Sequence, residues 1–217
     1  MSNSLYKKVG IATVIMMASV FLSRIFGFFR MMVIAYIGGR SGDVDAYQVA
    51  FVIAEVLNHI VASGFLSITF IPIFSNYLAK EQEDQGWEIF SIILTSFGSL
   101  LVMFIIIAHI FAPDIVAIIA RGRPDPVFRE SVTWMTRIII PAQFFFFVGG
   151  LFMAVQFAKE KFLIPAMAPL FYNLGIIAGG FLLVSRLGMQ GFSWRVLVGD
   201  FVGNFPYPVL YLKSPFI

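Results

Sequence analysis

Two arginines lie deep in the first apolar segment of the sequence, within the run Ser23-Arg24-Ile25-Phe26-Gly27-Phe28-Phe29-Arg30. An unpaired arginine in bilayer hydrocarbon costs about 2.5–3.5 kcal/mol on insertion scales, so such side chains face a protein interior or an aqueous cavity. On a helix, Arg24 and Arg30 lie about 120° apart, with Gly27 midway between them. Because guanidinium groups bind phosphate through two parallel hydrogen bonds, this face predicts a site for an anionic headgroup. Alternatively, Arg30 extends to the membrane interface and Arg24 pairs with a carboxylate on another helix.

A second group of polar residues lies in the next apolar segment, where Glu55 and His59 are one helical turn apart on the same face. Such a pair could relay protons or bind a cation, but two protein ligands are too few for a metal site. The preferred interpretation is that Glu55 pairs with Arg24 or Arg30 across a helix interface. Asn58 could donate a hydrogen bond to a headgroup or bridge two helices.

Prolines interrupt three of the apolar segments. Pro165 and Pro169, followed by Asn173, open the fifth segment, where they either free backbone carbonyls near a substrate site or simply begin the helix at the membrane interface. Pro141, in the fourth segment, leaves the same two alternatives open. Pro72 predicts a bend in the second segment, which is far longer than the membrane is thick.

The composition defines the class of protein. Of 217 residues, 59% are hydrophobic and 12% charged, and the mean hydropathy is +0.91. These values exclude a soluble globular enzyme and a disordered chain, and they predict an all-α polytopic membrane protein with room for about six spans. The chain has no cysteine, and its net charge of +3 is too small to indicate a nucleic-acid partner. The sequence contains no pattern typical of a nucleophile, a metal centre or a cofactor site, so we expect neither an enzyme nor a cofactor.

Hydropathy and its interruptions predict six membrane-spanning helices, and their approximate ranges are 10–37, 45–79, 88–112, 129–158, 162–185 and 191–212. Asp45, followed by Gln48, is typical of a capping box at the start of the second helix. The basic residues divide equally between the two sides of the membrane, so they do not decide the orientation. The paired lysines Lys7 and Lys8 before the first span favour a cytoplasmic N-terminus.

The sequence resembles the lipid II flippases of the MurJ/MviN family, in the MOP superfamily. Four motifs carry the resemblance in the family's order, namely the arginine run of residues 23–30, Asp45-Ala46-Tyr47 with Ala50-Phe51, Ala62-Ser63-Gly64-Phe65 with Phe70-Ile71-Pro72-Ile73-Phe74 and Tyr77, and Pro165-Ala166-Met167-Ala168-Pro169 with Asn173. The resemblance covers roughly residues 10–204.

The resemblance implies one lobe of a transporter in which two pseudo-symmetric six-helix lobes enclose a V-shaped cavity. Such a protein carries the undecaprenyl-pyrophosphate-linked peptidoglycan precursor between the leaflets of the bacterial inner membrane, with its N-terminus in the cytoplasm. The resemblance also implies that Arg24 and Arg30 contact the pyrophosphate. We predict in addition that Ser23, Gly27, Asn58 and His59 shape the pocket and that Asp45 caps or orients the second helix.

The sequence departs from the family pattern in two ways. Glu55-Val56-Leu57-Asn58-His59 stands where the family usually has basic residues, which makes an anionic substrate harder to hold. The chain also matches one lobe only, so residues 1–204 are interpreted as a six-helix lobe and 205–217 as an atypical tail, from truncation, a frameshift or a half-size protein. A single lobe cannot enclose the cavity, so we expect a homodimer, a second lobe or no transport. The alternatives are half of a MATE-type multidrug or cation antiporter, and a non-transporting fragment.

Overall fold

The computed structural model describes residues 2–39, 41–62 and 69–204, and this part of the chain consists of helices joined by short turns. Nine α-helices lie within it, namely α1 (Ser2–Gly38), α2 (Gly42–Ala62), α3 (Ile71–Ala79), α4 (Glu83–Ile110), α5 (Ala112–Ile119), α6 (Pro126–Ile139), α7 (Ala142–Ala158), α8 (Leu163–Leu187) and α9 (Gln190–Asn204). The predicted all-α class is therefore confirmed. The predicted tail, 205–217, lies outside the described residues.

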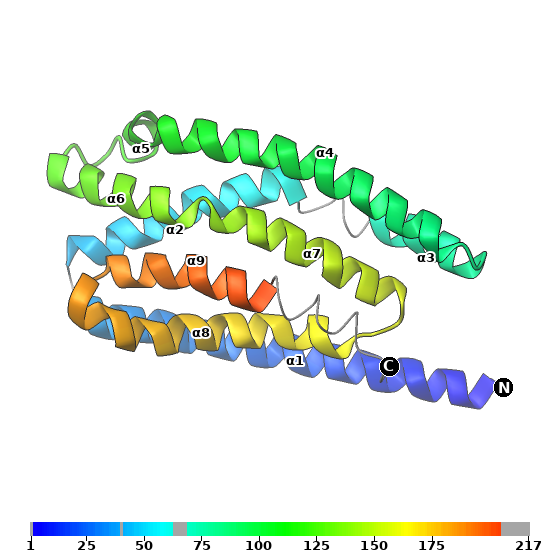
Figure 1. Ribbon diagram of the computed structural model, residues 1–217. Helices are drawn as coiled ribbons and strands as arrows, with labels where there is room; N and C mark the ends of the chain where they lie inside the picture. The colour runs from blue at the N-terminus through cyan, green and yellow to red at the C-terminus, as the bar shows by residue number, and fades with distance from the viewer. Residues whose placement is uncertain (1, 40, 63–68, 205–217) are drawn as a thin grey trace.

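The long helices run along one common direction, and α1 extends at its N-terminal end beyond α8, which lies beside it (Figure 1). Helix α8 packs along both α1 and α9, although α1 and α8 are separated by most of the sequence. Helices α2 and α6 form a second closely packed pair, while α7 contacts α3, α4 and α9. The first apolar segment is thereby held against the proline-containing segment, so two of the sequence motifs meet in space.

Two of the predicted ranges each include two of the helices that the structure describes. The range 45–79 includes α2 and α3, with Pro72 in the first turn of α3, and the predicted bend at Pro72 stays a prediction. Residues 63–68, between these helices, lie outside the described part. In the range 129–158, α6 ends at Ile139 and Pro141 caps the start of α7. Proline fits a first helical turn because its missing N–H would have no partner there, whereas it breaks the ladder inside a helix.

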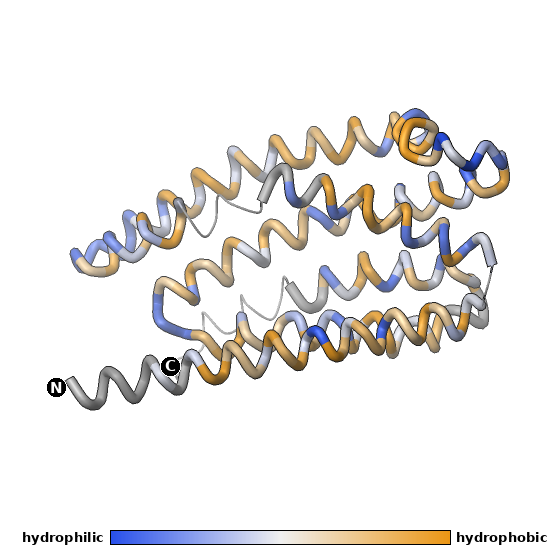
Figure 2. Tube along the Cα trace, turned by 180° about the vertical axis from the view of Figure 1, so that it is seen from behind, coloured by the Kyte–Doolittle hydropathy of each residue, from blue (hydrophilic) through white to orange (hydrophobic). Residues whose placement is uncertain are grey.

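Within the described part of the chain, four helical stretches are long and apolar enough to cross a membrane, namely Thr13–Gly38, Glu83–Ile110, Pro126–Ala158 and Leu163–Leu183. Apolar residues cover most of their length, and hydrophilic residues gather at the turns (Figure 2). The chain is therefore a multi-pass membrane protein. The predicted number of six spans is not confirmed, because parts of the second and of the last predicted range lie outside the described residues.

The start of α2 is held by an ion pair. Arg123, in the loop before α6, donates a hydrogen bond of 2.8 Å to Asp45 and lies over the ring of Phe128, 4.2 Å from its centroid. Because α2 begins at Gly42, Asp45 lies inside its first turn and not at its N-cap, so the predicted capping box was misplaced. The carboxylate instead joins α2 to the α5–α6 loop.

This ion pair is expected to contribute less than about 1 kcal/mol to stability, because the Arg123 and Asp45 side chains are 45% and 59% exposed. The check is a double-mutant cycle of Asp45→Ala and Arg123→Ala, measured by thermal unfolding in detergent. A coupling energy above about 2 kcal/mol would contradict the exposed geometry.

Candidate functional site

Polar groups along the α1–α8 contact satisfy one another. Asn173 donates hydrogen bonds from Nδ2 to the Pro169 carbonyl at 3.0 Å and, more weakly, to the carbonyl and hydroxyl oxygens of Ser23 at 3.4 and 3.5 Å. One turn earlier along both helices, the Ser19 hydroxyl donates to the carbonyl of Ala166. Asn173, one of the predicted site residues, thus links α8 to α1, the helix that carries the arginines.

The two prolines of this segment have different places. Pro165 lies in the first turn of α8, where its missing N–H has no cost, so at this position the helix-start interpretation fits. Pro169 lies inside α8 and has no N–H to donate to the carbonyl of Pro165, one turn earlier. At this position the interpretation of a freed backbone carbonyl fits. Both prolines line a pocket beside α1.

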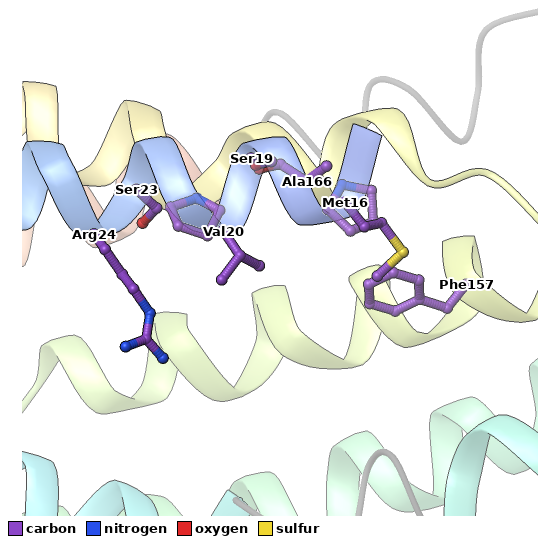
Figure 3. A pocket seen from close by; sticks show the side chains of 9 residues that line it. Met16, Ser19, Val20, Ser23, Arg24, Phe157 and Ala166 are labelled. Carbon is purple, nitrogen blue, oxygen red and sulfur yellow. The ribbon is translucent and has the colours of Figure 1, made fainter. Parts of the chain in front are cut away.

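That pocket has Arg24 at its edge, and we call it the Arg24 pocket. Its volume is about 380 Å³, and its walls come from three helices: Met16, Ser19, Val20, Ser23 and Arg24 of α1, Phe157 of α7, and Pro165, Ala166 and Pro169 of α8. Figure 3 shows the Arg24 side chain extending away from α8 towards α7. Within the described part of the chain, the guanidinium has no hydrogen-bond or ion-pair partner, so it is available to a ligand.

A second pocket surrounds Arg30, and we call it the Arg30 pocket. Its volume is about 260 Å³, and its walls come from four helices: Gly27 and Arg30 of α1, Phe51 and Glu55 of α2, Gln143 and Phe146 of α7, and Tyr172 and Asn173 of α8. The Arg30 guanidinium carbon lies 5.3 Å from the ring centroid of Phe51. Arg30 Nε and Gln143 Oε1 are buried without a hydrogen-bond partner. A ligand with both acceptor and donor groups would satisfy them.

The preferred pairing of Glu55 with an arginine is not observed. Among the described residues, neither Arg24 nor Arg30 forms an ion pair with Glu55. The reason is that Phe51, one turn before Glu55 on α2, occupies the position next to the Arg30 guanidinium. Glu55 still lines the Arg30 pocket, so its charge remains near that of Arg30.

His59 lies away from both arginines. With Glu55, Val52 and Val56 it lines a third, more open hollow of about 440 Å³ on α2. Its Nδ1 is 3.1 Å from the backbone carbonyl oxygen of Glu55. No group of three His, Cys, Asp or Glu residues suited to a metal ion occurs in the part that the structure describes. The side chain of Asn58 lies outside that part.

The structure adds residues to the site that the sequence did not indicate. Phe146 and Tyr172 line the Arg30 pocket, and their rings lie 5.8 Å apart, edge to face. Asp200 of α9, outside the lining of this pocket, is 1% exposed. An aspartate in an apolar segment is itself a signal of a functional position, and it was available in the sequence. In the sequence, nothing distinguishes Phe146 and Tyr172 from the many other aromatic residues.

Other predicted residues lie apart from the pockets. Asp45 is at the start of α2, Pro72 is exposed at the start of α3, and Pro141 is at the break between α6 and α7. None of the three lines either arginine pocket. All three lie at or near the start of a helix.

The sequence model of one family, described as "Lipid II flippase MurJ", matches residues 34–206. A probable lipid II flippase MurJ of Buchnera aphidicola subsp. Baizongia pistaciae is 34% identical over 197 residues, which cover 89% of this chain and 38% of that protein. A probable lipid II flippase MurJ of Thermotoga maritima is 30% identical over 173 residues, covering 80% of this chain and 36% of that protein.

A solved structure has the same fold. The lipid II flippase MurJ in an inward closed conformation superimposes with a TM-score of 0.74 at 22% identity, over 94% of this chain and 43% of that one. The chain thus spans about two fifths of the length of the relatives that it matches. The long match to the family model and the identity to a relative agree: the chain belongs to the lipid II flippase MurJ family.

Proposed function

We propose that this chain acts as one lobe of a lipid II flippase in the bacterial inner membrane, and that Arg24 and Arg30 contact the pyrophosphate of the lipid-linked peptidoglycan precursor. The observation that carries the proposal is that each arginine lines a pocket and neither is neutralised by an ion pair among the described residues. A guanidinium in such a position gains most from a doubly charged diphosphate, because charge-assisted hydrogen bonds strengthen away from water. The match to the family model begins at residue 34, so the assignment of the two arginines depends on the pockets.

The other site residues are proposed to support this contact in two ways. Ser23, Gly27, Asn58 and His59 shape the space around the headgroup. A structural or gating role is proposed for the rest, namely Asp45, Glu55, Pro72, Pro141, Pro165, Pro169 and Asn173. Asn173 is the best supported of these, because its amide bridges α8 to Ser23 between the two arginine pockets.

Transport needs a second wall for the cavity. In transporters built from repeats, the substrate site lies between two halves that rock against each other. We therefore propose that this lobe works against a second lobe or a second copy of the chain, with the N-terminus in the cytoplasm. The large exposed apolar side chains of α1 support a partner or lipid on that side, among them Phe21, Phe28 and Phe29.

The test is rescue of a bacterium depleted of its own lipid II flippase. The chain is expressed alone and together with the C-terminal lobe of a relative, and growth and lipid II translocation in spheroplasts are recorded. Rescue in either format supports the proposal, and rescue by the chain alone indicates a second copy as the partner. No translocation in either format, although the chain is inserted in the membrane, would contradict it.

A further inference from the structure

Helix α5 crosses the direction of the long helices. Figure 1 shows it nearly end-on beside the end of α4, while the long helices run across the view. Helices α2 and α6 extend further than α5 at this end, so α5 lies inward of the end of the bundle (Figure 1). Because the apolar helices cross the bilayer along their common direction, α5 lies along the membrane surface.

A proline and an arginine determine this change of direction. Pro113 has no N–H to donate to the carbonyl of His109, one turn earlier. Arg137 of α6 donates to that carbonyl instead, from Nε at 3.1 Å. This contact holds the end of α4 near the level of Arg137, and Phe111 is the one residue between α4 and α5.

The two faces of α5 have different surroundings. Ala112 and Val116, one turn apart, are fully buried, and Val116 packs in the hydrophobic core. Ile118 lies about 160° around the helix from Val116 and is 60% exposed. Phe111 and Ile119 are 52% and 51% exposed. The outer face of α5, which we define by Phe111, Ile118 and Ile119, thus presents large apolar side chains that the described part of the chain leaves uncovered.

This outer face continues an apolar surface of α4. The last turns of α4 expose Ile106, Ile107 and Ile110, and α4 is one of the four stretches that are long and apolar enough to cross the membrane. In a bilayer, acyl chains pack against such a surface as well as apolar side chains do. Since the same surface passes onto α5 at Phe111, lipid is the occupant that fits the outer face as well.

Aromatic and charged residues nearby indicate a shallow depth for α5. Trp134 of α6 is 53% exposed one turn before Arg137, and tryptophan is enriched at the interface between membrane and water. Asp114, in the first turn of α5, is exposed as well. A carboxylate is costly in hydrocarbon, whereas water and headgroups solvate it at the interface. These residues favour a position of α5 at the boundary between acyl chains and headgroups.

We infer that α5 is an interfacial helix whose partner is the lipid surface, with Phe111 and Ile118 inserted among the upper parts of the acyl chains. Helices of this kind bury their apolar face about 5–10 Å into the boundary. The loop after α5 carries Arg123, which pairs with Asp45 at the start of α2. The bound helix therefore places this loop, and its contact with α2, at the bilayer surface. This role goes beyond the proposed function and does not depend on transport.

The test uses spin labels on single cysteines, which need no background substitutions because the sequence contains no cysteine. Ile118→Cys carries the label on the outer face of α5. Met103→Cys is the lipid reference, since Met103 is 47% exposed on α4. Gly122→Cys is the water reference, because Gly122 is exposed in the following loop and a Cβ there meets no atom within 4 Å. Each labelled full chain is reconstituted in lipid nanodiscs.

Power-saturation EPR then measures how strongly each label is relaxed by oxygen, which concentrates in hydrocarbon, and by a nickel chelate, which stays in water. The label at Ile118 is expected to respond to oxygen and to lose most of the nickel response that the label at Gly122 shows. Its depth is expected to lie between those of the two references. Phe111→Cys reports on the same face and is read in the same way if Ile118→Cys does not fold.

Two results would overturn the assignment of α5 to the lipid surface. A nickel response at Ile118 equal to that at Gly122 would place the outer face in water. Weak responses to both reagents would show that protein covers this face, whether a second lobe or a second copy of the chain. Neither result bears on the rescue experiment, so the lipid contact of α5 and the proposed function fail independently.

Discussion

Replacing Arg30 by glutamine is expected to lower the affinity for lipid II by about 10- to 100-fold, because hydrogen bonds to charged groups contribute about 1.5–3 kcal/mol. Arg30 is held inside the lobe by Phe51, and its Nε lacks a partner, so little reorganisation is needed when an anion binds. Arg24→Gln is expected to have a smaller effect, since that side chain is exposed and must be ordered by the ligand. Binding in lipid nanodiscs measures both effects.

The matched control for these changes is Arg121→Gln. Arg121 is exposed in the loop between α5 and α6 and lines neither arginine pocket. The same charge is lost, so a general loss of attraction between the protein and an anionic lipid would appear in this variant as well. Equal affinities for Arg30→Gln and Arg121→Gln would exclude Arg30 from headgroup binding.

Replacing Gly180 by alanine is expected to destabilise the lobe by about 1–3 kcal/mol, the cost of overpacking a closely packed interface. A Cβ at this position of α8 would lie 2.1 Å from the ring of Phe192 in α9. Phe192 is fully buried and packs against Tyr47, whose ring centroid is 6.0 Å away. The ring therefore cannot move aside without disturbing α2.

The control for this prediction is Gly175→Ala on the same helix, where a Cβ meets no atom within 4 Å. This change is expected to be neutral or slightly stabilising, because alanine favours a helix over glycine by about 1 kcal/mol. Thermal unfolding in detergent compares the two variants with the parent. Similar unfolding temperatures for Gly180→Ala and Gly175→Ala would contradict the close α8–α9 contact.

The sequence predicted the fold class because apolar composition and helical length are properties of each segment by itself. It did not predict that the range 129–158 forms two helices, because hydropathy is continuous across the break at Pro141. The predicted number of six spans stays a prediction, because parts of the second and of the last segment lie outside the described residues.

The candidate site was predictable where it depends on a single helix. The positions of Arg24, Gly27 and Arg30 follow from helical geometry, and their angular separation explains why the arginines line two pockets and not one. The walls contributed by Phe146, Phe157 and Tyr172 depend on how α7 and α8 pack against α1. No local pattern distinguishes these aromatic residues from the many others in the chain.

The most direct test of the central claim is the contact between the arginines and the phosphorus atoms of lipid II. Solid-state NMR of the arginine-¹⁵N-labelled chain in bilayers with lipid II reports it as ¹⁵N–³¹P dipolar dephasing. Dephasing is expected for guanidinium nitrogens of the parent and of Arg121→Gln, and its loss is expected in the Arg24→Gln, Arg30→Gln double variant. Lipid II that binds the parent without dephasing, or equal dephasing in the double variant, would contradict the claim.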